Sequence, residues 1–185
     1  DVVWEDHEIE AVAAEMNAHV VRAFKLAAWT GLSRGDLVTL RWDEIKETHI
    51  ERRRSKTGVE QIIPLFDETS ALLANFPKSA VTVVTNHHGK PFTPRGLAMA
   101  VERARSEANE KRQDADKVAV GKTLHDIRGT FATRLMRRGF EDRDIDEIMG
   151  WETGKSARIR RRYISRRAVV ISAIVRMREK SKKGT

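Results

Sequence analysis

Four places in this 185-residue chain carry side chains that could handle a phosphate group. His125 and Arg128 are three residues apart, so on a helix they would share one face and could reach the same phosphate. The fork of an arginine matches the non-bridging oxygens of a phosphate, and a histidine can take or relay a proton. Such a pair is also typical of an ordinary helix surface, so it indicates this chemistry only in combination with other residues.

Lys56 is the second candidate. It lies in the sequence Lys56-Thr57-Gly58, which predicts a turn between two strand-like runs. A lysine at the tip of a hairpin can extend into a groove and protonate a leaving oxygen. Most turn lysines are simply exposed, and that alternative stays open.

Tyr163 is the only tyrosine of the chain and follows Arg160-Arg161-Arg162. A tyrosine hydroxyl normally has a pKa of about 10, so it is a poor nucleophile unless nearby cations favour its ionised form. The alternative is a ring that packs beside basic surface residues. Trp151, after Met149-Gly150, is the fourth candidate, because an indole N–H can donate to a phosphate oxygen. It would otherwise be a core tryptophan that follows the end of a helix.

The elements that must position these residues are mostly helical. Apolar residues recur at three- and four-residue steps along residues 6–30, which predicts one long helix ended by Gly31. Ser33 predicts the N-cap of a short second helix, with Asp36 three residues later. Further helices are expected over residues 95–111, 123–138, a short stretch that ends at Gly150, and 156–180.

Strand-like runs lie in the first half of the chain. Residues 50–54 and 59–64 flank a turn with Gly58, where a positive φ is easy, and they predict a β-hairpin. Residues 81–85 predict a third strand. The fold class is therefore expected to be α+β, mainly helical with a small three-stranded antiparallel sheet.

Composition narrows the classes of function. Cysteine is absent, which excludes disulfides and thiolate catalysis and fits a reducing cytoplasmic setting. The formal net charge of +8 favours a polyanionic partner, and residues 155–183 are rich in cations with Glu179 as their one acid. The alternative for that segment is a solvated basic tail. No apolar run approaches the roughly 18 residues of a membrane span, so no membrane partner is expected.

The order of the motifs is more specific than any one of them. The chain resembles the tyrosine recombinase or phage-integrase family over about residues 4–163, and residues 125–133 are the most specific part. The motifs that carry the resemblance are Thr30-Gly31-Leu32, Arg34-Gly35-Asp36-Leu37, Ser55-Lys56-Thr57-Gly58, His125-Asp126-Ile127-Arg128-Gly129-Thr130-Phe131-Ala132-Thr133, Met149-Gly150-Trp151 and Tyr163.

The resemblance implies a site-specific recombinase or integrase that breaks and rejoins double-stranded DNA through a 3′-phosphotyrosyl intermediate. Carried over by position, Tyr163 is the nucleophile, Arg128 the second of two phosphate-clamping arginines, and His125 a proton-transfer residue. Lys56 is then the general acid, and Trp151 takes a place where the family has His or, less often, Trp. The resemblance implies no cofactor and no metal, because the bond energy is kept in the enzyme–DNA link. It also implies a homo-oligomer, with a tetramer on DNA for the full-length protein.

Two features depart from the family pattern. The first arginine of the family would fall at Ser33, three residues before Asp36, and Arg34 is one place late. One residue rotates a helical side chain by about 100°. Either the turn is remodelled so that Arg34 enters the site, or the arginine is lost. The spacing from Trp151 to Tyr163 is the second departure, since the family has about three residues fewer.

The chain starts about where a catalytic domain would, so it is interpreted as the C-terminal domain of a longer integrase. Residues 1–185 are expected to form one catalytic domain that lacks the N-terminal core-binding domain, with residues 164–185 as a basic C-terminal helix or tail. Weak, salt-sensitive DNA binding follows. Two alternatives remain: a catalytically impaired DNA-binding domain on the same fold because of Ser33, and a helical DNA-binding regulator unrelated to recombinases.

Overall fold

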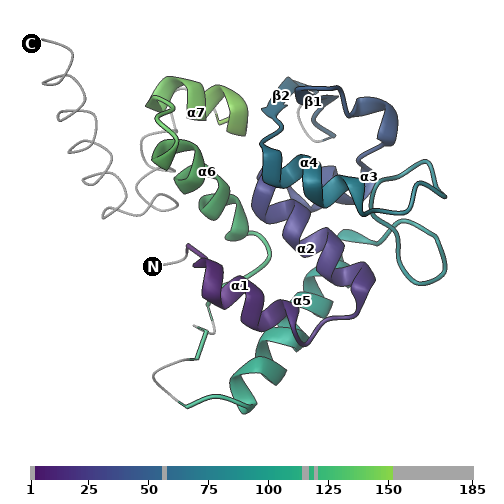
Figure 1. Ribbon diagram of the computed structural model, residues 1–185, viewed down its shortest axis with the longest axis vertical. Coiled ribbons are helices and arrows are strands. Elements are labelled where there is room, and N and C mark those ends of the chain that lie inside the picture. Colours follow the sequence, from purple (N-terminus) through teal and green to yellow (C-terminus); the bar gives the residue numbers. More distant parts are fainter. Residues whose placement is uncertain (1–2, 56–57, 114–116, 119–120, 152–185) are drawn as a thin grey trace, which may run out of the picture.

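The computed structural model describes residues 3–55, 58–113, 117–118 and 121–151. Lys56, Tyr163 and the helix predicted at residues 156–180 lie outside these ranges. The chain forms, in order, α1 (Asp6–Ala13), α2 (Ala18–Thr30), α3 (Arg34–Thr39), the short 3₁₀ helix η1 (Trp42–Glu44), β1 (His49–Arg53), β2 (Glu60–Pro64), α4 (Asp67–Ala74), α5 (Pro94–Glu110), α6 (Ile127–Arg137) and α7 (Asp142–Met149). The expected α+β class is confirmed, with mostly helices and one small antiparallel sheet at the upper edge of the molecule (Figure 1).

The long helix predicted over residues 6–30 is two helices, and that prediction was wrong. α1 ends at Ala13 and α2 begins at Ala18. Asn17 causes the new start, because its side chain accepts hydrogen bonds from the backbone N–H of His19 and Val20, both at 3.1 Å. Such a cap satisfies N–H groups that a helix start leaves unpaired. α4 was not predicted at all.

The β1–β2 hairpin is antiparallel and pairs Ile50 with Ile63, and both of these side chains are fully buried. The third strand predicted at residues 81–85 does not join it in the described part of the chain. That segment lies instead beside the residues before η1, where Val83 N–H donates to Leu40 O at 2.8 Å. Val83 and Val84 are both buried, so the two-residue alternation of a one-faced strand is broken.

The hydrophobic core surrounds α2, which contacts α1, α3, α4, α5 and α6 and lies centrally in Figure 1. Its Phe24 and Leu26 are fully buried, as is Phe131 of α6. Complete burial of one such side chain stabilises a fold by roughly 1.5–3 kcal/mol. The helix that carries Arg128 is thereby fixed against the helix that leads into the turn at Gly31. Nowhere in the described ranges is a helix both long and apolar enough to cross a membrane.

The N-terminal segment holds the start of α6 in place. Trp4 exchanges two hydrogen bonds with the Thr130 hydroxyl, at 2.9 and 3.0 Å, and its indole N–H donates to Thr123 O at 3.0 Å. Lys122 Nζ lies 2.7 and 2.5 Å from the two carboxylate oxygens of Glu8 in α1. These buried contacts fix the turn that contains His125.

Candidate active site

The turn after α2 brings the backbone of Gly31 onto α6. Gly31 has φ +61°, and its N–H closes the helix by donating to Ala27 O at 2.9 Å. A Cβ at this position would lie only 2.5 Å from Phe131 Cδ1. Both the left-handed backbone and the close packing therefore require glycine here.

The segment around His125 is a turn rather than a helix. Thr123 N–H and Oγ1–H donate to Asp126 Oδ2 at 2.9 and 2.6 Å, and α6 begins only at Ile127. The prediction that the helix starts at Thr123 was wrong. The Asp126 side chain binds the Thr123 backbone N–H, and this local turn takes the place of the first helical turn. His125 is exposed in the turn, whereas Arg128 is buried in the first turn of α6. The two residues do not share a helix face.

Arg128 joins two helix ends. Its Nη1 donates to Gly31 O, after α2, and its Nη2 donates to Met149 O, at the end of α7, at 2.9 Å. Carbonyl groups at helix C-termini lack partners within their own helix. One buried guanidinium thus satisfies two such carbonyls and is held rigidly between them.

Ser33 has a structural role in the place where the family pattern has an arginine. It caps α3, since its Oγ accepts from Asp36 N–H at 3.2 Å and donates to Asp36 Oδ2 at 2.5 Å. The predicted cap is confirmed. Arg34 follows as the first residue of α3, and its side chain is exposed and makes no hydrogen bond or ion pair with the residues that the structure describes.

Asp36 connects α3 to the end of β1. Its Oδ1 accepts from Ser55 N–H at 3.0 Å and from Ser55 Oγ at 2.9 Å. Burial by itself would raise the pKa of this carboxyl, but the hydrogen bonds from Ser33 and Ser55, with the charge of Arg52, hold the pKa below its ordinary value. Asp36 is therefore ionised and buried, and it holds Ser55, the residue directly before Lys56 in the sequence.

Two arginines that the sequence interpretation missed surround this anchor. Arg52 is buried and donates through Nη1 to Asp36 O and through Nη2 to Thr39 Oγ1, the latter at 3.2 Å. Arg54 Nε lies 3.9 Å from Asp36 Oδ2. The signal was present, because alternate residues of a strand share a face and Ile50, Arg52 and Arg54 follow that period.

Arg54 also reaches α7. Its Nη1 donates to Gly150 O at 2.6 Å. Gly150 ends α7 with φ +60°, as predicted, and a Cβ there would lie 2.9 Å from Arg54 Nη1. Glycine at this position thus serves both the helix cap and the approach of the guanidinium.

Trp151 follows the two carbonyls that accept from Arg128 and Arg54. It is partly buried, packs against the core, and donates its backbone N–H to Asp146 O at 2.9 Å. The structure therefore places Arg128 against the backbone two residues before Trp151, places His125 in an exposed turn and leaves Arg34 on the outer side of α3. Lys56 and Tyr163 fall outside the described ranges.

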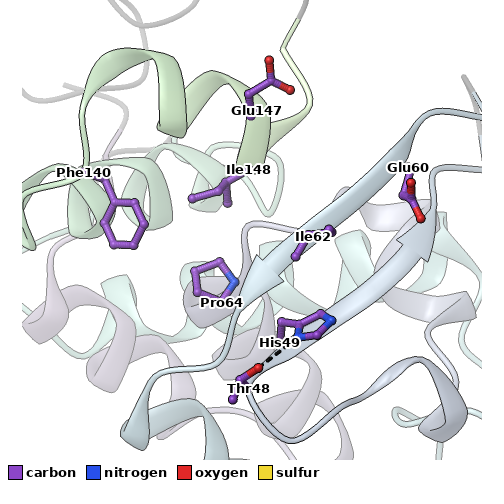
Figure 2. A pocket seen from close by; sticks show the side chains of 8 residues that line it. All are labelled: Thr48, His49, Glu60, Ile62, Pro64, Phe140, Glu147 and Ile148. Atoms are coloured by element: carbon purple, nitrogen blue, oxygen red, sulfur yellow. Dashed lines mark hydrogen bonds between the residues drawn. The ribbon is translucent and has the colours of Figure 1, made fainter.

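A pocket of about 450 Å³ lies nearby, between the outer face of β2 and α7, but its chemistry does not suit a phosphate. Figure 2 shows apolar Ile62, Pro64 and Ile148 at its walls together with the carboxylates of Glu60 and Glu147. Two carboxylates would repel an anion. The cationic groups at the ends of α2 and α7 are the better candidate site.

Known proteins resemble this chain along most of its length. The model of the phage integrase family matches residues 5–167. The integrase of Escherichia phage HK022 is 27% identical over an alignment of 144 residues, and the match covers 73% of this chain and 39% of that protein. Tyrosine recombinase XerC of Listeria monocytogenes serotype 4b (strain F2365) is 28% identical over 100 residues, 54% of this chain and 31% of that protein.

A solved structure has the same fold. It is a lambda integrase tetramer bound to a Holliday junction, which superposes with a TM-score of 0.70 at 20% identity, over 85% of this chain and 47% of that one. The chain thus spans less than half the length of each of these three proteins.

Proposed function

The chain belongs to the phage integrase family, and from this premise we propose that it cuts and rejoins double-stranded DNA through a 3′-phosphotyrosyl link to Tyr163. The observation that carries the proposal is the setting of Arg128. Its guanidinium is buried and held by Gly31 O and Met149 O, which fixes a cation between the ends of α2 and α7. Phosphoryl transfer depends chiefly on such positioned cations.

The Tyr163 hydroxyl passes its proton to His125 as its oxygen attacks the phosphorus of a DNA phosphodiester, and the bond from phosphorus to the 5′-oxygen breaks. Lys56 protonates that leaving oxygen, which gives a free 5′-hydroxyl and a 3′-phosphotyrosyl enzyme. Arg128 and the Trp151 indole N–H stabilise the non-bridging oxygens, and His125 assists proton transfer. Attack by a second 5′-hydroxyl reverses the step and restores the tyrosine.

We extend the proposal to partners. Lambda integrase forms a tetramer on a Holliday junction, and the likeness of fold supports two proposals for this chain. Its partner is DNA, and it forms homo-oligomers on that DNA. The net charge of +8 agrees with a polyanionic partner.

A second candidate is a DNA-binding domain of the same fold with little cleavage activity. Ser33 favours it, because this residue serves as a helix cap and leaves no guanidinium in that place. Loss of one transition-state donor typically costs about 10²–10³ in rate.

Covalent trapping separates the two candidates. Duplex DNA from beside the source gene, made with bridging phosphorothiolates so that the cleaved end cannot religate, is incubated with the chain and with Tyr163→Phe. An adduct on a denaturing gel that is absent from the Phe variant supports cleavage by Tyr163. If the chain binds the DNA but forms no adduct, the proposal fails in favour of the DNA-binding domain.

A further inference from the structure

We propose that Arg54 supplies a second guanidinium to the phosphate-binding site and takes over the task for which Ser33 has no suitable side chain. The inference rests on the proposed function. It assigns the contact with phosphate to Arg54, the residue that follows β1, rather than to Arg34 on α3.

Arg54 and Arg128 converge on adjacent peptide groups. Arg128 Nη2 donates to Met149 O at 2.9 Å, and Arg54 Nη1 donates to Gly150 O at 2.6 Å. The two side chains come from residues 74 positions apart in the sequence (128 − 54), on different elements. Both guanidinium groups therefore contact the backbone that leads directly into Trp151.

Arg54 keeps donors for a ligand. A guanidinium has five N–H groups, and the bond to Gly150 O uses one of them. Nε is buried without a hydrogen-bond partner, and Nη2 makes no hydrogen bond to the residues that the structure describes. The side chain is 17% exposed, compared with 4% for Arg52, so part of it is open to solvent.

The Asp36 carboxylate lies near the Arg54 guanidinium but does not take up all of its donors. Asp36 Oδ2 lies 3.9 Å from Arg54 Nε, but Ser33 and Ser55 already donate to this carboxylate. Arg52 differs, because both of its Nη atoms donate to α3, to Asp36 O and Thr39 Oγ1. Arg52 thus braces the fold, whereas Arg54 is tethered at one nitrogen and directed toward α7.

Gly150 supports the same conclusion. A Cβ at this position would lie 2.9 Å from Arg54 Nη1 and 3.1 Å from Arg54 Cδ, so a residue other than glycine would require the arginine side chain to shift. The end of α7 and the Arg54 side chain are therefore in close contact.

The test compares adduct formation by single variants on the phosphorothiolate duplex, at saturating DNA. Arg54→Met keeps much of the apolar stem but removes the guanidinium, and we expect it to slow adduct formation about 10²–10³-fold. Arg53→Met is the matched control, since Arg53 is the exposed neighbour and carries the same charge. It should leave the saturated rate unchanged. Arg34→Met tests the rival arginine, and a rate loss there with none in Arg54→Met overturns the inference.

A rescue experiment separates catalysis from mere support of the fold. Ser33→Arg, added to Arg54→Met, returns a guanidinium from α3 but not the hydrogen bond to Gly150 O. We expect the double variant to form the adduct at least tenfold faster than Arg54→Met alone. If Arg54→Met is slow and the double variant stays slow while thermal unfolding shows both to be folded, Arg54 is structural and the inference is wrong.

The two levels of the proposal fail differently. Absence of an adduct from the unaltered chain overturns the proposed function and this inference with it. An adduct that depends on Tyr163 but forms equally fast in Arg54→Met overturns the role of Arg54 alone.

Discussion

At the residue scale, Asp36 is the group on which the hairpin and α3 converge. Its carboxylate accepts hydrogen bonds from Ser33 and Ser55 and lies 3.8 Å from Arg52 Nη2 and 3.9 Å from Arg54 Nε. The carboxylate is 2% exposed. Burial of a charge is costly unless it is well paired, and here the hydrogen bonds from Ser33 and Ser55, with the charge of Arg52, keep the carboxyl ionised.

Asp36 should make the free energy of unfolding depend on pH in the acid range. Its pKa in the folded chain lies below the ordinary value of 3.8, so the stabilisation is present at neutral pH and is lost as the pH falls below 3.8 through the lowered folded value. We expect Asp36→Asn to lower the free energy of unfolding at pH 7 by about 2–3 kcal/mol, because a charged acceptor of several hydrogen bonds is lost. Urea unfolding at neutral and at acid pH measures both quantities.

The difference between the parent chain and Asp36→Asn should shrink at acid pH. The control is Asp43→Asn, since Asp43 pairs with Arg41 at the surface and its removal should change stability little at either pH. An equal loss for Asp36→Asn at both pH values would contradict the linkage.

At the element scale, the ends of α2 and α7 are the parts that form the candidate site. Gly31 and Gly150 both adopt a left-handed backbone conformation. Arg128 donates to Gly31 O, and Arg54 donates to Gly150 O. A helix that ends in this conformation turns sharply and leaves carbonyl oxygens for other partners. The arginines satisfy these oxygens, so the geometry of the site and the stability of the helix ends are coupled.

Gly31→Ala tests that coupling. The new Cβ would meet Phe131 Cδ1 at 2.5 Å in addition to the strain of φ +61°. Strain alone costs roughly 1–2 kcal/mol, and the clash should add to it. Gly89→Ala is the matched control, because Gly89 has φ +71° with nothing within 4 Å of a Cβ. Thermal unfolding should show a larger fall in Tm for Gly31→Ala, and equal shifts would argue against close packing at the turn.

At the scale of the whole molecule, the net charge should govern the proposed encounter with DNA. The chain carries Lys+Arg 35 against Asp+Glu 27, hence +8. Contacts to phosphates release bound counterions, so affinity depends on salt. The chain also spans less than half the length of its curated relatives, and we therefore expect modest affinity from this part alone.

Salt titration checks this expectation with Tyr163→Phe, which avoids covalent capture. The logarithm of the association constant for duplex DNA should fall linearly with the logarithm of salt concentration, with a slope of about −0.9 for each phosphate contacted. Fluorescence anisotropy between about 50 and 200 mM salt covers the range in which the change is large. An affinity that stays constant over this range would refute a phosphate-dominated interface.

The sequence by itself determined the features that depend on neighbouring residues. The cap at Ser33, the glycine helix ends at Gly31 and Gly150, and the hairpin were predicted correctly, because a cap or turn is fixed by residues a few positions apart. The ordered motifs also identified the family. Lys56 and Tyr163 stay predictions from sequence.

Only the tertiary structure decided which groups meet. Arg128 contacts a carbonyl 97 residues away and Arg54 one 96 residues away, and no local period encodes such pairs. The break before α2, the late start of α6 and the absence of a third paired strand in the described ranges likewise came from side chains competing for backbone groups and from packing. The contact of Arg54 depends on the packing of α7 beside the hairpin. The acceptor, Gly150 O, is a backbone oxygen of a kind that every residue has, so no residue type in the sequence marks it.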